Sequence, residues 1–152
     1  MLRTLELCDM DRAAVVHRRS RDHALPWVAV RHTPEEDQWF FRERVFSSCH
    51  TSGYFENGEL VGFIAFRKGW IDHLYVLPNC QRRGFGTALL KVAMGQHHAL
   101  SLWTFQRNAF ARQFYEKHGF VLADQTDGAG NEEGEPDALY VWKSIARAQV
   151  TS

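Results

Sequence analysis

The chain has 152 residues, of which 45% are hydrophobic, 13% aromatic and 24% charged. This composition is typical of a globular protein and excludes a disordered or low-complexity chain, and the length predicts one domain, residues 1–152. Eighteen basic residues balance eighteen acidic ones. The resulting net charge of zero argues against a protein that binds nucleic acid through its phosphates.

The cysteines, Cys8, Cys49 and Cys80, are odd in number, lie far apart and form no CxxC pair. This pattern argues against a disulfide framework and a zinc knuckle, so we expect a reducing setting and no metal site. The N-terminus lacks the apolar segment of a signal peptide, and no run approaches the roughly 18 apolar residues of a membrane span. We therefore expect a cytoplasmic protein with no membrane or nucleic-acid partner.

The first fifty residues are expected to be mostly helical. After a short strand over residues 2–7, Asp9 is a candidate cap for the first helix. The second helix has a stronger start signal, because Thr33 precedes Pro34 and Glu36 follows three residues after the threonine. This pattern predicts a capping box with proline at the first helical position.

The apolar period changes to two from residue 51 onward. Asn57-Gly58 between alternating runs predicts a β-hairpin with a type I′ turn, because that turn needs positive φ at both central residues. Residues 70–76 are expected to form the third strand of this meander. An amphipathic helix follows over about residues 84–96, since apolar residues recur there at helical spacing.

The C-terminal part alternates strands and a helix. We expect a strand over residues 100–105, a helix over 108–118 closed by Gly119 in a left-handed conformation, and strands over 120–123 and 139–142. The predicted fold class is α/β (α+β), with a mixed, mostly antiparallel central sheet and helices on both faces.

The segment QRRGFGT, residues 81–87, lies between a strand and a helix. Amide groups at a helix start lack helical acceptors, and the helix dipole adds positive charge there. Gly84 and Gly86 have no Cβ to keep an anion from the backbone, while Arg82 and Arg83 add charge. These features together predict a pyrophosphate-binding loop, although a tight strand-to-helix turn alone would also use the glycines.

Two better-known phosphate loops do not fit this segment. A P-loop requires lysine and serine or threonine after its last glycine, and that lysine is missing here. A Rossmann fingerprint requires a third glycine where this chain has Leu89, and the segment follows a meander rather than a first βα unit.

Two separate motifs resemble the GCN5-related N-acetyltransferase (GNAT) family. In that family an apolar strand triplet is followed by proline and then by Q/R-x-x-G-x-G/A at the start of a helix. A second segment reads N-x-x-A-x-x-F/L-Y-x-x-x-G-F. Both patterns are present between residues 70 and 123, in Leu74-Tyr75-Val76, Pro78, Gln81 to Gly86, Asn108, Ala111 and Phe114 to Phe120.

The resemblance implies acetyl-CoA as co-substrate. It also implies that strands 70–76 and 100–105 splay apart, so that backbone groups of the first strand bind the pantetheine arm and one N–H polarises the thioester carbonyl. The residues it assigns to cofactor binding are Leu74, Tyr75, Val76, Gln81, Arg82, Arg83, Gly84, Phe85, Gly86, Thr87 and Asn108.

Tyr115 is the candidate general acid for the leaving thiolate, on the same resemblance. A phenol of pKa about 10 loses roughly 2 kcal/mol on protonating a thiolate of pKa about 8.5, so the site must narrow that gap. The alternative is a core tyrosine beside Phe110 and Phe114 on an amphipathic helix.

The acceptor is expected to be a primary amine. An amine of pKa near 10.4 is neutral in only about one molecule in 2,500 at pH 7, so a base or a water relay should help. Asp72 and His73, on opposite faces of their strand, and Glu132 and Glu133 in a loop are the candidate bases. The acidic run over residues 124–137 is either a solvated loop or a means of attracting a cationic acceptor.

The sequence thus predicts an N-acetyltransferase in which the amine attacks acetyl-CoA directly in a ternary complex. The alternatives are a non-catalytic acyl-CoA-binding module and a protein N-terminal or lysine acetyltransferase. Family members that act on ribosomal protein N-termini tend to carry a carboxylate where this chain has Leu102-Trp103-Thr104, which argues against such a substrate. The acceptor, the acyl-chain preference and a homodimer are left open.

Overall fold

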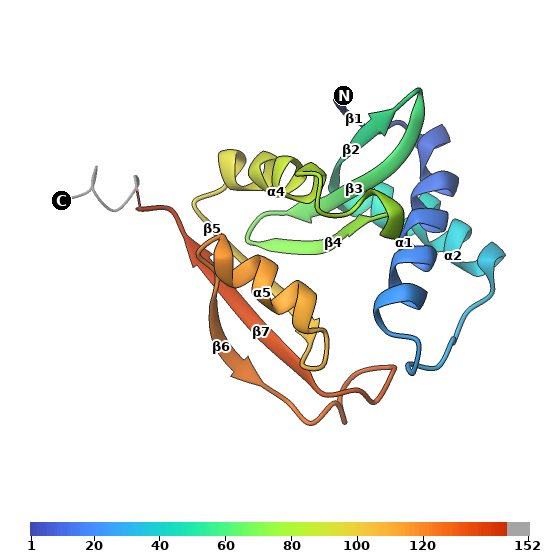
Figure 1. The fold of residues 1–152 in the computed structure, drawn as a ribbon. Coiled ribbons are helices and arrows are strands. Elements are labelled where there is room, and N and C mark those ends of the chain that lie inside the picture. The colour runs from blue at the N-terminus through green and yellow to red at the C-terminus, as the bar shows by residue number, and fades with distance from the viewer. Residues whose placement is uncertain (146–152) are drawn as a thin grey trace. The chain divides into compact units, whose positions relative to one another are not determined.

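A computed structural model describes residues 1–145 of the chain (Figure 1). The strands follow the order β1-β2-β3-β4-β5-β7-β6 in one mostly antiparallel sheet, which confirms the expected α/β class. The strands are β1 Leu2–Thr4, β2 His50–Glu56, β3 Glu59–Arg67, β4 Trp70–Val76, β5 Ala99–Phe105, β6 Val121–Gln125 and β7 Asp137–Lys143. The helices are η1 Leu7–Asp9, α1 Met10–Ala24, α2 Pro34–Phe40, η2 Phe41–Val45, α3 Phe46–Ser48, η3 Pro78–Cys80, α4 Phe85–Gln96 and α5 Ala109–Lys117.

The chain divides into two compact units. The first unit comprises residues 1–67 and 71–93, and the second comprises residues 68–70 and those from 94 onward. Strands β4 and β5 are parallel, and their register pairs Trp70, the first residue of β4, with Ser101. The splay expected further along β4 stays a prediction, as does a single domain over residues 1–152.

Helices cover both faces of β3 in the first unit. A Cβ added to Gly62 would lie 3.1 Å from the Tyr75 carbonyl oxygen and 3.3 Å from Leu89 Cδ1 of α4, so β3 and α4 need a glycine there to approach closely. The next residue, Phe63, points to the opposite face, because side chains alternate along a strand. There its ring lies 5.7 Å from that of Phe41.

Local signals in the first unit were largely correct. Asn57 and Gly58 have φ of 53° and 78°, as the I′ turn requires. The Thr33 hydroxyl accepts from the Glu36 amide at 3.1 Å and the Glu36 carboxylate accepts from the Thr33 amide at 2.9 Å, which confirms the capping box. The expectation for Asp9 was wrong in detail. Asp9 precedes α1, but its carboxylate accepts from the Glu6 amide and makes no cap bond to α1.

The π-helix η2 was not predicted. It follows α2 directly and leads into α3, so residues 34–48 run as one interrupted helix. A π-turn adds one residue to the helical turn and thereby changes which side chains face the core. Phe41 and Val45, at its two ends, are both buried.

In the second unit, strands β5, β7 and β6 pair in that order, and α5 is joined to β7 through Tyr140 (Figure 1). Helix α5 ends before Gly119, whose φ of 91° confirms the predicted left-handed residue. Tyr140 of β7 is fully buried, and its hydroxyl donates to Glu116 at 2.7 Å and accepts from Arg112 Nε at 2.9 Å. Within residues 1–145, no helix is both long and apolar enough to cross a membrane.

Candidate functional site

The glycine loop has a backbone shape that suits an anion. Arg82 and Gly84 have φ of 64° and 87°, whereas Arg83 between them does not have positive φ. Positive φ on either side of one residue is typical of turns in which successive N–H groups form a concave anion-binding nest, and we call this loop the nest. A Cβ built on Gly84 would meet no atom within 4 Å, so the space beside the loop is open. The nest leads directly into the first turn of α4, where amide groups lack acceptors within the helix.

The loop is fastened to the end of β4. The Gln81 side-chain amide donates to the Val76 carbonyl at 3.0 Å, and the Ser20 hydroxyl of α1 donates to the same carbonyl at 2.8 Å. Gln81, one of the expected cofactor residues, therefore acts in the structure as an anchor that sets the position of the loop relative to β4.

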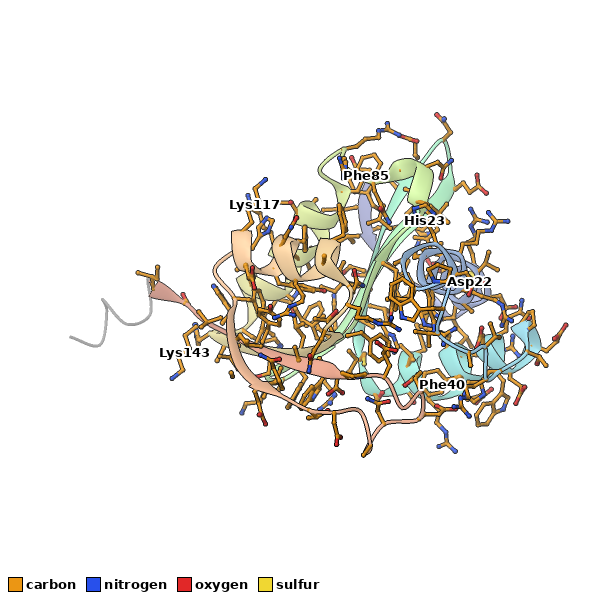
Figure 2. All side chains as sticks on the ribbon, turned by 60° about the horizontal axis from the view of Figure 1, so that its bottom comes forward. Asp22, His23, Phe40, Phe85, Lys117 and Lys143 are labelled. Carbon is orange, nitrogen blue, oxygen red and sulfur yellow. The ribbon has the colours of Figure 1, made fainter. Side chains whose placement is uncertain are left out.

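Arg83 lies in a stack of side chains at the start of α4 (Figure 2 labels Phe85). Its guanidinium lies 4.8 Å from the centre of the Phe85 ring, which stacks on Tyr54 at 4.2 Å. Both terminal nitrogens of Arg83 also donate to the Glu56 carboxylate of β2, and this contact lowers the pKa of Glu56. Of the two positive charges expected beside the loop, that of Arg83 is therefore already paired with a carboxylate.

A cluster of aromatic and imidazole rings lies on one face of β4, which we call the imidazole cluster: His17, His73, Tyr75, Phe40 and Phe41. The ring of His17, from α1, lies 4.7 Å from that of Tyr75 and 5.8 Å from that of His73. Phe41 lies 5.0 Å from His73, and the half-exposed Phe40 lies 6.3 Å from it (Figure 2 labels Phe40).

Each histidine of this cluster has a buried ring nitrogen without a hydrogen-bond partner, Nδ1 of His17 and Nδ1 of His73. Burial lowers the pKa of His17 to about 3, and electrostatic interactions with His73, Arg21 and Arg18 lower it further. Burial lowers the pKa of His73 to about 4, against the opposing effect of Asp72. Both imidazoles are therefore neutral at pH 7.

His17 was missed by sequence reasoning. The signal was its place one turn beyond Ala13 and next to Val16 on α1, two residues that are fully buried. A histidine on such a face is more often a packed residue than a functional one. His17 becomes a candidate functional residue only because its ring contacts that of His73.

Asp72 points away from the cluster, as the alternation along β4 predicted. Its carboxylate accepts two hydrogen bonds from Arg67, at 2.8 and 3.2 Å, and one from the Cys49 thiol at 3.4 Å. These partners make Asp72 a weak candidate for a base, because its lone pairs are already engaged.

In the second unit, Tyr115 is buried between Phe114 and Phe120, with ring separations of 5.3 and 5.4 Å. Asn108 caps α5, because its side-chain oxygen accepts from the Ala111 amide at 3.1 Å. Both residues thus pack or cap the helix that carries them, and their expected roles in catalysis and cofactor binding stay predictions.

The acidic segment over residues 124–137 is partly neutralised. Glu135 accepts two hydrogen bonds from Arg107, at 2.9 and 3.1 Å, and Asp137 accepts from Asn131 and Thr126. Glu132 and Glu133 lie in the loop between these contacts. In the part of the chain that the structure describes, no group of three or more His, Cys, Asp or Glu side chains is arranged to hold a metal ion.

A family model described as the acetyltransferase (GNAT) family matches residues 15–120. Peptidyl-lysine N-acetyltransferase YiaC from Escherichia coli is 36% identical over 70 residues, which are 45% of this chain and 48% of that protein. The "Probable N-acetyltransferase Rv2775" of Mycobacterium tuberculosis is 43% identical over 82 residues, 53% of this chain and 40% of that protein. The match thus spans less than half of either relative.

Solved structures share the fold. The PaiA N-acetyltransferase from Thermoplasma acidophilum, in complex with coenzyme A, has a TM-score of 0.72 at 23% identity and covers 94% of this chain and 98% of its own. The apo form of YjaB from Escherichia coli has a TM-score of 0.78 at 18% identity, over 95% of this chain and 98% of its own. At these identities the similarity concerns the fold alone.

Proposed function

The chain belongs to the acetyltransferase (GNAT) family, and from that membership we propose that it transfers the acetyl group of acetyl-CoA to a primary amine in a ternary complex. The observation that carries the cofactor assignment is the nest at Arg82 to Gly84, open beside Gly84 and continuous with the start of α4. That geometry suits a pyrophosphate, and PaiA of the same fold binds coenzyme A.

The proposed cofactor site consists mainly of backbone groups. Backbone amides of residues 82–87 hold the pyrophosphate, and backbone groups of Leu74, Tyr75 and Val76 hold the pantetheine arm and polarise the thioester carbonyl. Asn108 is a further cofactor contact. The proposal also treats residues 1–152 as one acetyltransferase domain, and the family model's span of residues 15–120, which includes parts of both units, supports this. A cytoplasmic location and a homodimer stay predictions from the sequence.

The reaction forms one bond and breaks one. The amine nitrogen attacks the thioester carbon, a C–N bond forms, the C–S bond breaks, and the nitrogen loses a proton to solvent or a base. The Tyr115 hydroxyl donates its proton to the departing thiolate, which leaves as the free thiol, and the tyrosinate regains a proton from solvent. Release of that thiol is the measurable sign of turnover.

The experiment is a thiol-release assay with acetyl-CoA and a panel of polyamines, amino acids, aminoglycosides and peptides. The panel includes peptidyl lysine, since the relative YiaC is named for that acceptor. Turnover with at least one amine supports the proposal. Acetyl-CoA binding without turnover of any amine would instead favour a non-catalytic acyl-CoA-binding module.

Tyr115→Phe should lower kcat by roughly 10² to 10⁴ and leave acetyl-CoA affinity nearly unchanged, because the variant removes only the proton donor. Tyr140→Phe is the matched control, since it removes another buried hydroxyl of the second unit. Full turnover by Tyr115→Phe would leave the core-tyrosine interpretation in place.

Gly84→Asp should abolish detectable acetyl-CoA binding, because it places a carboxylate beside the nest. Gly69→Asp is the matched control, since Gly69 has a φ of 81° and equally open surroundings but lies in the turn before β4. Equal affinity in the two variants would contradict the proposed pyrophosphate site.

A further inference from the structure

Two unpartnered nitrogen atoms stand out in the imidazole cluster. Buried polar atoms in folded proteins nearly always have a hydrogen-bond partner, because a buried atom without one is not compensated for the loss of its hydrogen bonds to water. Nδ1 of His17 and Nδ1 of His73 are buried and have none in the structure. The two rings are neighbours, 5.8 Å apart, and each also contacts the rings of Tyr75 and Phe41. Each nitrogen lacks the partner that a buried polar atom needs, and a hydrogen-bond donor that entered the cluster would supply it.

The cluster adjoins the strand segment to which we assign the thioester. Tyr75 is one of the three residues proposed to hold the pantetheine arm, and His73 lies two positions before it on the same face of β4. Phe40, half exposed beside His73, borders the cluster on the solvent side. A group bound at the two histidines would therefore lie on the strand where acetyl transfer is proposed to occur.

The charges around the cluster do not favour a bound cation. Arg18 and Arg21 lie on the same helix as His17, and their positive charges act on its ring. Their carboxylate partners, Asp37 and Asp22, are already ion-paired with them. From β4 the nearest carboxylate is Asp72, which is held by Arg67. An ammonium group placed here would have aromatic rings and neutral imidazoles around it, but no uncommitted carboxylate among these groups to offset its desolvation.

We propose that Nδ1 of His17 and Nδ1 of His73 accept hydrogen bonds from the acceptor's amino group in its neutral form, so that the enzyme selects weakly basic primary amines such as α-amino groups over the side-chain amine of lysine. This inference rests on the proposed acetyltransferase function, and it departs from the expectation, based on Leu102-Trp103-Thr104, that the acceptor is not a protein N-terminus. An α-amino group of pKa about 7.7–8.0 is neutral in about one molecule in ten at pH 7, whereas a lysine amine of pKa about 10.4 is neutral in about one in 2,500.

A pair of matched peptides tests the selectivity directly. Both have the same sequence with a single lysine; one has a free α-amine and an acetylated lysine, and the other has an acetylated N-terminus and a free lysine. We expect kcat/KM at pH 7 to favour the free α-amine by at least about 30-fold, and mass spectrometry should locate the new acetyl group there. Equal rates, or a preference for lysine, overturn the inference.

Variants of the two histidines test the assignment of the site. His17→Phe and His73→Phe keep an aromatic ring but remove the unpartnered nitrogen, so each should lower kcat/KM for the α-amine peptide at least tenfold while the KM for acetyl-CoA stays unchanged. The unfolding free energy should stay level or rise, because no hydrogen bond of Nδ1 is lost. His50→Phe is the control, since His50 also packs on a phenylalanine, Phe66, but lies outside the cluster.

The outcomes separate the two proposals. If acetyl-CoA binds and lysine is acetylated as fast as the α-amine, the inference fails and the proposed function stands. If no amine is acetylated, both fail. Unchanged kinetics in His17→Phe and His73→Phe, with the peptide preference intact, would show that the selectivity comes from elsewhere and overturn the assignment to these histidines.

Discussion

The hydroxyl of Tyr140 in the second unit and the Nδ1 atoms of His17 and His73 in the first are all buried polar groups, but their surroundings differ. Tyr140 donates to Glu116 and accepts from Arg112, so its oxygen is satisfied on both sides. The histidine Nδ1 atoms lie among aromatic rings with no partner. A satisfied network holds a structure together, whereas an unsatisfied pair costs stability in the free protein.

That difference separates two kinds of buried polar group. A buried group without a partner is typical of a functional site, so the imidazole cluster has the features of a binding site, whereas the Tyr140 network has those of a structural contact. The comparison makes opposite predictions for substitutions in the two regions, which we give from the largest expected effect to the smallest.

Acid should destabilise the first unit through its histidines. Unfolded imidazoles bind a proton near the reference pKa of 6.5, whereas folded His73 and His17 do so only near 4 and 3. The unfolded state therefore binds more protons, so the free energy of unfolding falls as pH drops from about 6.5 to 4, by a few kcal/mol at about 1.4 kcal/mol per pKa unit.

Urea unfolding at a series of pH values checks this prediction. Because carboxylates also titrate near pH 4, the quantity to compare is the difference between the wild type and the double variant His17→Phe/His73→Phe. The double variant should lose the part of the pH dependence that lies between pH 6.5 and 5. Parallel curves for the two proteins would contradict buried neutral histidines.

Gly128→Ala should disrupt the acidic segment of the second unit. Gly128 has a φ of 86°, and an added Cβ would lie 2.5 Å from the backbone carbon of Glu135, which cannot move without opening the loop. We expect a loss of unfolding free energy on the order of 2 kcal/mol. Gly130→Ala, at a position with open space and no positive φ, should have little effect. Similar melting temperatures for both variants would argue against a closely packed loop.

Tyr140→Phe should lower the free energy of unfolding, whereas His73→Phe should leave it unchanged or raise it. This pair of variants is the most direct test of the comparison. Removing the Tyr140 hydroxyl leaves Glu116 and Arg112 without their shared partner and should cost about 1 kcal/mol of unfolding free energy. Removing the His73 imidazole should cost nothing or stabilise the protein at pH 7. Thermal and urea unfolding measure both, and equal losses would mean that the His73 nitrogen has a partner in solution.

Glu56→Gln should have the smallest effect, and that effect should be a change in the affinity for acetyl-CoA. Removing the carboxylate releases Arg83 and takes a negative charge from the vicinity of the proposed pyrophosphate site. Acetyl-CoA should then bind more tightly by about two- to fivefold, as expected for an exposed ion pair. Calorimetry at low and high salt checks this, with Glu59→Gln on the same hairpin as control. Weaker binding would mean that Glu56 orients Arg83 for the ligand.

Much of the local structure could be predicted because its causes lie within a few residues of each other. Asn57 and Gly58 adopt the positive φ that a I′ turn needs, and the Thr33–Glu36 box closes on atoms three residues apart. The strand over residues 70–76 was also correct at both ends, since turns bound it. The π-helix at residues 41–45 was not predicted, because that interruption of the helix carried no local signal that we recognised.

The sequence by itself determined the order of elements, the glycine loop and the motifs that place the chain in its family, since each depends on neighbours along the chain. The tertiary structure alone decided that Glu56 pairs with Arg83 and that His17 meets His73. Those contacts depend on how a hairpin, a helix and a strand pack, which is fixed by burial of many side chains at once. Whether a histidine is solvated or left without a partner is therefore a property of the packing rather than of the residues beside it.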